Sequence, residues 1–295
     1  MRRATLPPEL IGRPFTRADA RAAGLSPAQL RSTAYRRLFH NVYVDASAPD
    51  GLELWAAAVR LVLPADAVVG YTAAAWLHGA DLRDRRSASL EVVAQRADQI
   101  RIAGVSATSA LLEPGDVMEV HGVPVTTPVR TAFDLARRKD VLEAVVAIDA
   151  MLNRGGCGLD DLAGYTASHR GWRYVRTVDD ALRHAEPLSQ SPMESRQRMR
   201  LVLAGLPRPR AQVPVAEADG RVFAYLDNGY DEFRVGLDYD GEVHRERWQY
   251  DLERQERVRD LGWWHRRYTR LHIQHGWPQM VAQVRTALLA AGWRG

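Results

Sequence analysis

Hydrophobic and polar positions divide this 295-residue chain into three stretches with different periodicities. In residues 1–48 the pattern predicts short amphipathic helices followed by a short strand region in which apolar and polar residues alternate. In residues 49–186 it predicts apolar helices and short strands. Residues 187–295 begin at helical spacing and change to strand alternation. The polar, proline-bounded segment EPLSQSPM at 186–193 separates the last two stretches. The pattern predicts a mixed α/β (α+β) fold with three domains at these bounds.

Two short helices joined by a tight turn are predicted near the N-terminus. Thr16 and Asp19 have the spacing of a capping box at the start of the first helix, and Gly24 ends that helix. Ser26 then caps a second helix, which begins at a proline and which we expect to run over residues 27–37. This arrangement predicts a helix-turn-helix.

A β-hairpin wing over residues 38–44 completes the predicted N-terminal domain, which has the pattern of a winged helix-turn-helix. In the second helix Leu30 and Ala34 share the inward face, which leaves a polar and basic face for a DNA major groove. The side chains expected to contact DNA are Arg17, Gln29, Arg31, Ser32, Tyr35, Arg36 and Arg37 on the helices, and His40 and Asn41 at the wing tip.

The distribution of charge supports a double-stranded DNA partner for this domain. Residues 1–44 contain eight arginines against Glu9 and Asp19, a balance of +6, whereas the whole chain carries +4 and the remainder therefore −2. Clustered positive charge of this kind is typical of a nucleic-acid footprint. The alternative is that the arginines only keep a small helical module soluble. Capping, spacing, wing and charge agree with one another, so DNA binding is favoured over it.

The middle stretch predicts structure without a catalytic signature. Apolar spacing indicates helices over residues 52–63, 73–78, 128–137 and 141–152, and strands near 90–93, 105–108 and 117–125, the last broken at His121-Gly122. Trp76 and Leu77 are expected in the core, with His78 as a core or turn histidine. Arg130 and Asp134 are expected to form an i,i+4 helix pair.

Two acidic residues are predicted to meet in the last stretch. Alternating apolar positions indicate two antiparallel strands, with Asn228-Gly229 as the hairpin turn between them. Asp227 ends the first strand and Asp238 lies on the second, with His244 just beyond. Two carboxylates held together in this way commonly bind a divalent metal over a phosphodiester.

This stretch resembles the restriction-endonuclease-like fold, in the branch of very-short-patch-repair endonucleases. The resemblance rests on Glu194 in SPMESRQRMR, Asp227, and Asp238 in LDYDGEVH. It implies that Glu194, Asp227 and Asp238 are Mg²⁺ ligands and catalytic residues, with His244 as a base, if the site is active. Asp238 stands where Glu is more usual, and Asp240 occupies a position where the wider superfamily often has a lysine.

A second resemblance concerns the order of motifs along the chain. The predicted winged helix is followed by YTAAAWLHG at 71–79 and HGVPVTTPVRTAFDLA at 121–136. This order resembles AbiEi-type antitoxins of type IV (abortive-infection) toxin-antitoxin systems, many of which carry an endonuclease-like tail. The resemblance implies repression of the protein's own promoter by the winged helix. It also implies that the middle domain acts against a nucleotidyltransferase-type toxin.

Cysteine usage and hydropathy limit the remaining alternatives. Cys157 is the sole cysteine, which excludes an intramolecular disulfide and a cysteine-based zinc site. A strand expected over residues 271–273 places His272 and His275 on different faces, so this pair is not expected to bind metal. Without an apolar run of membrane-spanning length, we expect a cytoplasmic protein with no membrane partner.

The leading hypothesis from the sequence is a DNA-binding antitoxin and autorepressor that requires no cofactor. The alternative is a Mg²⁺-dependent DNA endonuclease.

Overall fold

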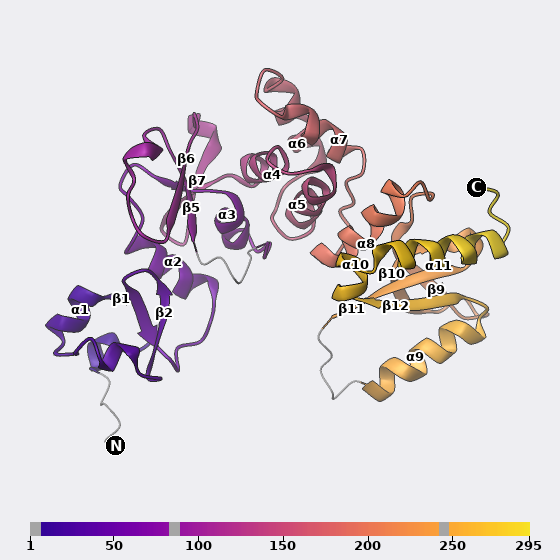
Figure 1. The fold of residues 1–295 in the computed structure, drawn as a ribbon, viewed down its shortest axis with the longest axis horizontal. Helices are drawn as coiled ribbons and strands as arrows, with labels where there is room; N and C mark the ends of the chain where they lie inside the picture. The colour runs from indigo at the N-terminus through magenta and orange to yellow at the C-terminus, as the bar shows by residue number, and fades with distance from the viewer. Residues whose placement is uncertain (1–6, 83–88, 242–247) are drawn as a thin grey trace. The chain divides into compact units, whose positions relative to one another are not determined.

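The computed structural model describes residues 7–82, 89–241 and 248–295. The chain separates into two compact units. The first comprises the chain up to Asp134 together with Arg154–Cys157, and the second comprises Leu135–Asn153 and Gly158–Gly295. In the described ranges, helices accompany three sheets of three, four and five strands, which confirms the mixed α+β class (Figure 1). The boundary between the units lies within a helix, and the three-domain division stays a prediction.

The N-terminal part of the first unit is a small antiparallel sheet with short helices. Its sheet has the order β1-β3-β2. The elements are η1 (Pro8–Leu10), β1 (Phe15–Thr16), α1 (Arg17–Ala22), η2 (Gln29–Arg31), β2 (Tyr35–Phe39) and β3 (Val42–Asp45). The expected Thr16–Asp19 capping box is confirmed at the start of α1. Gly24 follows α1 with a φ of 79°, a backbone conformation that glycine adopts without strain.

The second helix expected over residues 27–37 is wrong. The predicted cap does form, because the Ser26 N–H donates to Gln29 Oε1 at 2.8 Å and the Gln29 N–H donates back to Ser26 Oγ at 3.3 Å. However, only the single turn η2 follows, and β2 begins at Tyr35. The ring of Tyr35 packs edge-on against Phe15 at 5.7 Å. Burial of Tyr35 and Phe39 on a paired strand therefore outweighs the local helix signal.

The rest of the first unit is built on a five-stranded sheet of order β6-β5-β4-β8-β7. Its strands are β4 (Val68–Val69), β5 (Leu90–Ala94), β6 (Val105–Ser109), β7 (Val117–Val120) and β8 (Val123–Thr126). The accompanying helices are α2 (Leu52–Arg60), α3 (Tyr71–Leu77), η3 (Ala97–Gln99), η4 (Pro114–Asp116) and α4 (Pro128–Ala136), which runs on into the second unit. The turn at His121-Gly122 between β7 and β8 agrees with the sequence prediction.

The second unit joins a group of helices to a four-stranded sheet. The helices α5 (Val141–Asn153), α6 (Leu159–Ser168) and α7 (Val175–Leu182) precede α8 (Pro192–Leu203). The sheet, of order β12-β11-β10-β9, contains β9 (Arg210–Ala216), β10 (Val222–Tyr230), β11 (Val235–Asp240) and β12 (Trp264–Thr269). The remaining elements are η5 (Asp231–Phe233), α9 (Trp248–Asp260), α10 (Arg270–Gln274) and α11 (Trp277–Ala290). Strands β9, β10 and β11 are antiparallel, and β12 returns parallel to β11 after α9.

Two local expectations in this unit are wrong. Asn228 and Gly229 do not form the hairpin turn, because β10 continues to Tyr230 and η5 makes the connection. The buried Asn228 amide donates instead to the side chain of Gln197 at 2.9 Å and to the Glu194 carbonyl at 3.2 Å. The strand expected over residues 271–273 is the short helix α10, where His272 serves as a capping residue for the backbone N–H of Thr269 at 3.1 Å.

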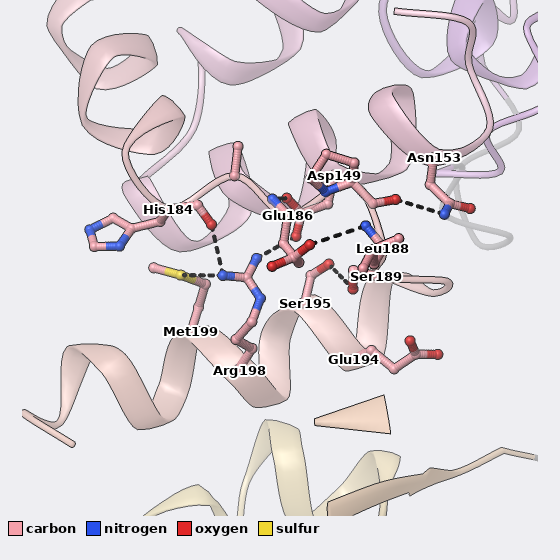
Figure 2. Close-up of polar contacts among 12 residues, drawn as sticks. Asp149, Asn153, His184, Glu186, Leu188, Ser189, Glu194, Ser195, Arg198 and Met199 are labelled. Carbon is pink, nitrogen blue, oxygen red and sulfur yellow. Dashed lines mark hydrogen bonds and ion pairs between the residues drawn. The ribbon is translucent and has the colours of Figure 1, made fainter. Parts of the chain in front are cut away.

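A buried ion pair fixes α8 against the preceding helices (Figure 2). The Arg198 guanidinium donates to the carboxylate of Asp149 on α5 at 2.6 Å and to the His184 carbonyl at 2.7 Å. The other oxygen of Asp149 accepts the backbone N–H of Glu186 at 2.7 Å. In Figure 2, Glu194 extends away from the guanidinium of Arg198 on the same helix. Helix α8 also contacts β10 and β11, so it connects the helices to the C-terminal sheet.

Candidate nucleic-acid interface and carboxylate cluster

Three arginines surround a pocket in the N-terminal part of the first unit. Arg17 and Arg21 project from α1 and Arg31 from η2, and all three are exposed. The pocket has a volume of about 410 Å³, with Leu25, Leu30 and Tyr43 also in its lining. The Arg17 Nε donates to the Tyr43 hydroxyl at 3.0 Å. The structure therefore brings together two residues predicted to contact DNA, Arg17 and Arg31, and adds Arg21.

Other residues predicted to contact DNA differ in their availability. Tyr35 is only 6% exposed and packs in the domain core, so the prediction that it reaches base edges is wrong. Arg36 pairs with Asp50 at 2.6 Å and donates to a backbone carbonyl. Gln29 is engaged in the cap with Ser26, and the Ser32 hydroxyl donates to the carbonyl of Gln29 at 2.6 Å.

The hairpin between β2 and β3 presents the remaining predicted contacts. Arg37, His40 and Asn41 are exposed, and Asn41 occupies the turn with a φ of 66°. Asparagine tolerates this left-handed conformation better than most residues. These three side chains are accessible to a partner, but they are not in the lining of the arginine pocket.

The carboxylates of Glu194, Asp227 and Asp238 interact across α8, β10 and β11. The Asp227 N–H donates to Asp238 Oδ1 at 3.2 Å, and Asp227 Oδ2 accepts the N–H of Tyr239 at 2.7 Å. Glu194 Oε2 accepts the backbone N–H of Gln190 at 2.9 Å. Glu194 and Asp238 are 6% and 4% exposed, so the cluster is largely withdrawn from water.

Burial and mutual repulsion perturb the acids of this cluster. Burial raises the pKa of Asp227 to about 7, and the negative charges of Glu194 and Asp238 add to this effect. Burial also raises the pKa of Glu194. For Asp238 burial is again the largest influence, but hydrogen bonding and positive charge from His265 and Arg254 outweigh it and lower the pKa.

Two residues that the sequence did not assign to this cluster hold Asp238. Its Oδ2 accepts from Arg254 on α9 at 3.0 Å and contacts Nε2 of His265 on β12 at 3.0 Å. Asp240 pairs with Arg267 at 2.9 Å. Only the parallel pairing of β11 with β12 brings His265 to Asp238, and no motif marks it. His244, the predicted base, lies outside the described residues.

The nuclease-like resemblance implies that Glu194, Asp227 and Asp238 bind Mg²⁺, and the contacts of these three side chains test whether they could do so. Among the residues that the structure describes, no group of three His, Cys, Asp or Glu is arranged to hold a metal ion. One oxygen of Asp238 already accepts hydrogen bonds from Arg254 and His265. In this arrangement the three carboxylates do not fit a Mg²⁺ site.

The motif residues of the middle stretch build structure. His78 Nε2 lies 2.8 Å from the carbonyl of Thr126, and the hydroxyls of Thr126 and Thr131 lie 2.7 Å apart. Buried Arg130 pairs with Asp134 at 2.7 Å, as predicted, and also with Asp116 at 2.5 Å. These contacts connect α3, β8 and α4.

The described geometry defines a mixed α/β protein with a basic N-terminal pocket and a buried carboxylate cluster in its C-terminal sheet. Residues 66–184 match the family model of the AbiEi antitoxin C-terminal domain. The match begins before β4, ends after α7, and covers about two fifths of the chain (119 of 295 residues). What this stretch is similar to is therefore the C-terminal domain of an antitoxin from a toxin-antitoxin system.

Comparison with known proteins also gives relatives from Mycobacterium tuberculosis. Uncharacterized protein MT2308 of strain CDC 1551 / Oshkosh is 27% identical over 150 residues, which are 50% of this chain and 55% of that protein. Uncharacterized protein Rv2248 of strain ATCC 25618 / H37Rv matches to the same extent. The chain thus spans about half the length of the curated relatives it matches. The crystal structure of RV2827C protein from the same species aligns over 68% of this chain and 79% of that chain, with 13% identity and a TM-score of 0.36.

Within the described ranges, no helix has the length and apolar character needed to cross a membrane.

Proposed function

We propose that this protein is the antitoxin of a toxin-antitoxin pair whose toxin is of the nucleotidyltransferase type. We further propose that it represses its own operon by binding double-stranded DNA through residues 1–48. The observation that carries the antitoxin assignment is the match of residues 66–184 to the AbiEi antitoxin C-terminal domain. The resemblance of the motif order supplies the type of toxin and the autorepression.

The burial of the motif side chains supports an antitoxin that acts through its surface. Arg130 and Asp134 are fully buried and paired with each other, so they stabilise the fold and present no reactive group to a substrate. Antitoxin activity should therefore depend on the exposed side chains that this scaffold carries. No cofactor is needed for such a role.

Co-expression with the neighbouring toxin gene tests the antitoxin proposal. The full-length protein should restore growth to cells in which the toxin is induced. Arg294→Ala, which changes an exposed side chain outside residues 66–184, should rescue equally well. If the full-length protein accumulates in soluble form and growth stays arrested, the antitoxin assignment is wrong. A neighbouring methyltransferase gene in place of a nucleotidyltransferase gene would instead favour restriction or repair.

Exposed cationic side chains support the proposed DNA binding. Arg17 and Arg31 line the pocket, whereas Arg37, His40 and Asn41 lie on or beside the β2–β3 hairpin. We assign Arg31 to base contacts, and we assign Arg17 and Arg37 to phosphates. The exposed hairpin turn is proposed to contact the adjacent backbone or minor groove.

Binding titrations on the protein's own promoter and on scrambled DNA separate these roles. Arg31→Ala should cost about 1–3 kcal/mol on the promoter and reduce discrimination, whereas Arg37→Ala should weaken binding to all sequences alike and lower the salt slope by roughly one. Equal losses on both DNAs from both variants would reduce the interaction to electrostatic contact. If neither variant loses affinity, another surface binds DNA.

A Mg²⁺-dependent endonuclease is the second candidate function. Two observations favour it. Glu194, Asp227 and Asp238 lie close enough to influence one another. The elements that carry them follow the chain order helix, three strands, helix, strand. Against it are the contacts of Asp238 with Arg254 and His265, and the acidic Asp240 at the position often held by lysine. For this reason we place endonuclease activity second.

A further inference from the structure

The pocket between α1, η2 and β3 has the chemistry of a ligand site. We propose that it binds a nucleoside phosphate, with the phosphate on Arg17 and Arg21, the polar edge of the base on Arg31, and the flat face of the base or the sugar on its apolar floor. This inference deepens the proposed DNA binding, because it names the chemical unit that the N-terminal region recognises. The same unit can come from a free nucleotide or from a nucleotide within a DNA strand.

The floor of the pocket is apolar and firmly packed. Leu25 and Leu30 line it while being only 7% and 8% exposed, since both belong to the core of this small sheet region. Tyr43 forms an aromatic part of the lining, and its ring stacks on Phe15 with centroids 6.3 Å apart. An apolar floor of this kind contributes little to binding of a bare phosphate ion, but it can pack against a base or a sugar.

The three arginines give the pocket a strong preference for anions. In the described part of the chain, no carboxylate forms an ion pair with Arg17, Arg21 or Arg31. The acidic residue on the same helix, Asp19, is occupied, because its Oδ2 accepts both the N–H and the hydroxyl of Thr16 at 2.8 Å. Guanidinium groups bind phosphate oxygens through paired, charge-assisted hydrogen bonds. A phosphate is therefore the anion that this group of side chains suits best.

Contacts with Tyr43 hold the guanidinium group of Arg17 at the pocket. Its Nε donates to the Tyr43 hydroxyl at 3.0 Å, and its guanidinium carbon lies 6.0 Å from the centre of the same ring. These contacts orient one side of the guanidinium and leave its terminal nitrogens for a ligand. Arg21 has no comparable internal contact in the described residues, so substituting it should affect ligand binding more than folding.

The size of the pocket favours a ligand larger than an inorganic anion. Its volume of about 410 Å³ lies within the range of roughly 300–1,000 Å³ that is typical of small-molecule sites. The leucines and Tyr43 suit a flat, partly apolar end of a ligand, and the three arginines suit an anionic end. A nucleoside monophosphate has this division.

Isothermal titration of the full-length protein tests the proposal. The probes are the four deoxynucleoside 5′-monophosphates, the corresponding nucleosides, inorganic phosphate and a promoter duplex. We expect at least one monophosphate to bind more tightly than its nucleoside and than inorganic phosphate. Arg21→Ala should weaken that binding about tenfold or more, the loss expected for one charge-assisted contact. Arg101→Ala, an exposed arginine outside the pocket, should leave it unchanged.

Competition distinguishes the two sources of the ligand. If saturating monophosphate displaces the promoter duplex, the pocket takes a nucleotide of the DNA. If monophosphate binds and the duplex is not displaced, the pocket serves a free nucleotide. Both results support the site, and monophosphate binding without any duplex binding would defeat only the DNA-binding proposal. The site is overturned if no monophosphate binds more tightly than inorganic phosphate, or if Arg21→Ala retains full affinity with an unchanged thermal midpoint.

Discussion

The guanidinium of Arg198 lies 2.6 Å from the carboxylate of Asp149, and both side chains are almost completely buried. The pair joins α8, which also carries Glu194 of the carboxylate cluster, to α5. Burial raises the pKa of Asp149 despite the adjacent Arg198, because removal of the carboxylate from water is the larger effect. The position of Glu194 therefore depends on helices that precede the C-terminal sheet in the chain.

Removing one partner of this ion pair should destabilise the second unit strongly. Arg198→Ala leaves Asp149 buried without its cation, and we expect a loss of about 3–5 kcal/mol in the free energy of unfolding. Denaturant unfolding followed by circular dichroism measures this loss. Arg183→Ala is the matched control, because its pair with Asp180 is exposed and should contribute about 0–1 kcal/mol.

Replacing both partners by apolar residues separates the pairing from the packing. The double variant Asp149→Leu with Arg198→Met should recover most of the stability lost in Arg198→Ala, since no uncompensated charge remains. A double variant as unstable as the single one would show that the hydrogen bonds to the backbone of His184 and Glu186 matter more than the ion pair.

Acid should destabilise the first unit through His78. Burial lowers the pKa of His78, although its hydrogen bond to the Thr126 carbonyl acts in the opposite direction. The unfolded chain then binds a proton that the folded chain resists, at pH values near and below the ordinary histidine pKa of about 6.5. The stabilisation is complete above this pH and is lost as the pH falls.

Thermal midpoints of the wild type and His78→Gln between pH 8 and pH 5 measure this effect. The difference between them should be pH-dependent, with the wild type losing more stability toward acid. His184, whose pKa is also lowered by burial, is present in both proteins and cancels from the difference. Parallel pH profiles would contradict the role assigned to His78.

The carboxylate cluster should not cleave DNA at a useful rate in the wild-type protein. Arg254 and His265 both engage Asp238, and Asp240 stands where a lysine often supports catalysis. Incubation of plasmid DNA with purified protein and Mg²⁺ or Mn²⁺ should give no nicking above the metal-only control. Metal-dependent nicking that disappears in Asp227→Ala would promote the endonuclease to the leading function.

Two glycines should respond oppositely to substitution by alanine. A Cβ added at Gly236 in β11 would overlap Leu226 Cδ1, so Gly236→Ala should cost about 1–3 kcal/mol through overpacking. Gly164 lies within α6 and has no atom within 4 Å of such a Cβ, so Gly164→Ala should gain about 0.4–1 kcal/mol. Unfolding midpoints in denaturant distinguish the two, and destabilisation by both would contradict the open space at Gly164.

Local chemistry in the sequence was sufficient for much of the fold. The Thr16–Asp19 capping box, the turn at His121-Gly122 and the i,i+4 pair of Arg130 with Asp134 each depend on residues a few positions apart. Residues a few positions apart can adopt only a few backbone conformations relative to one another. The contacts between them can therefore be predicted from the sequence. The approach of Asp227 to Asp238 also followed from it, because adjacent antiparallel strands bring such residues together.

Tertiary structure decided the features that depend on distant partners. Tyr35 lies on a strand because Phe15 and β3 bury it, although Ser26 and Gln29 form the cap of a helix. Asn228 remains within β10 because Gln197 on α8 satisfies its amide. His265 reaches Asp238 only through the parallel strand that follows α9. A contact between residues far apart in the chain forms only after the chain between them has closed into a loop, which costs conformational entropy. Local sequence patterns therefore do not indicate which distant residue will be the partner.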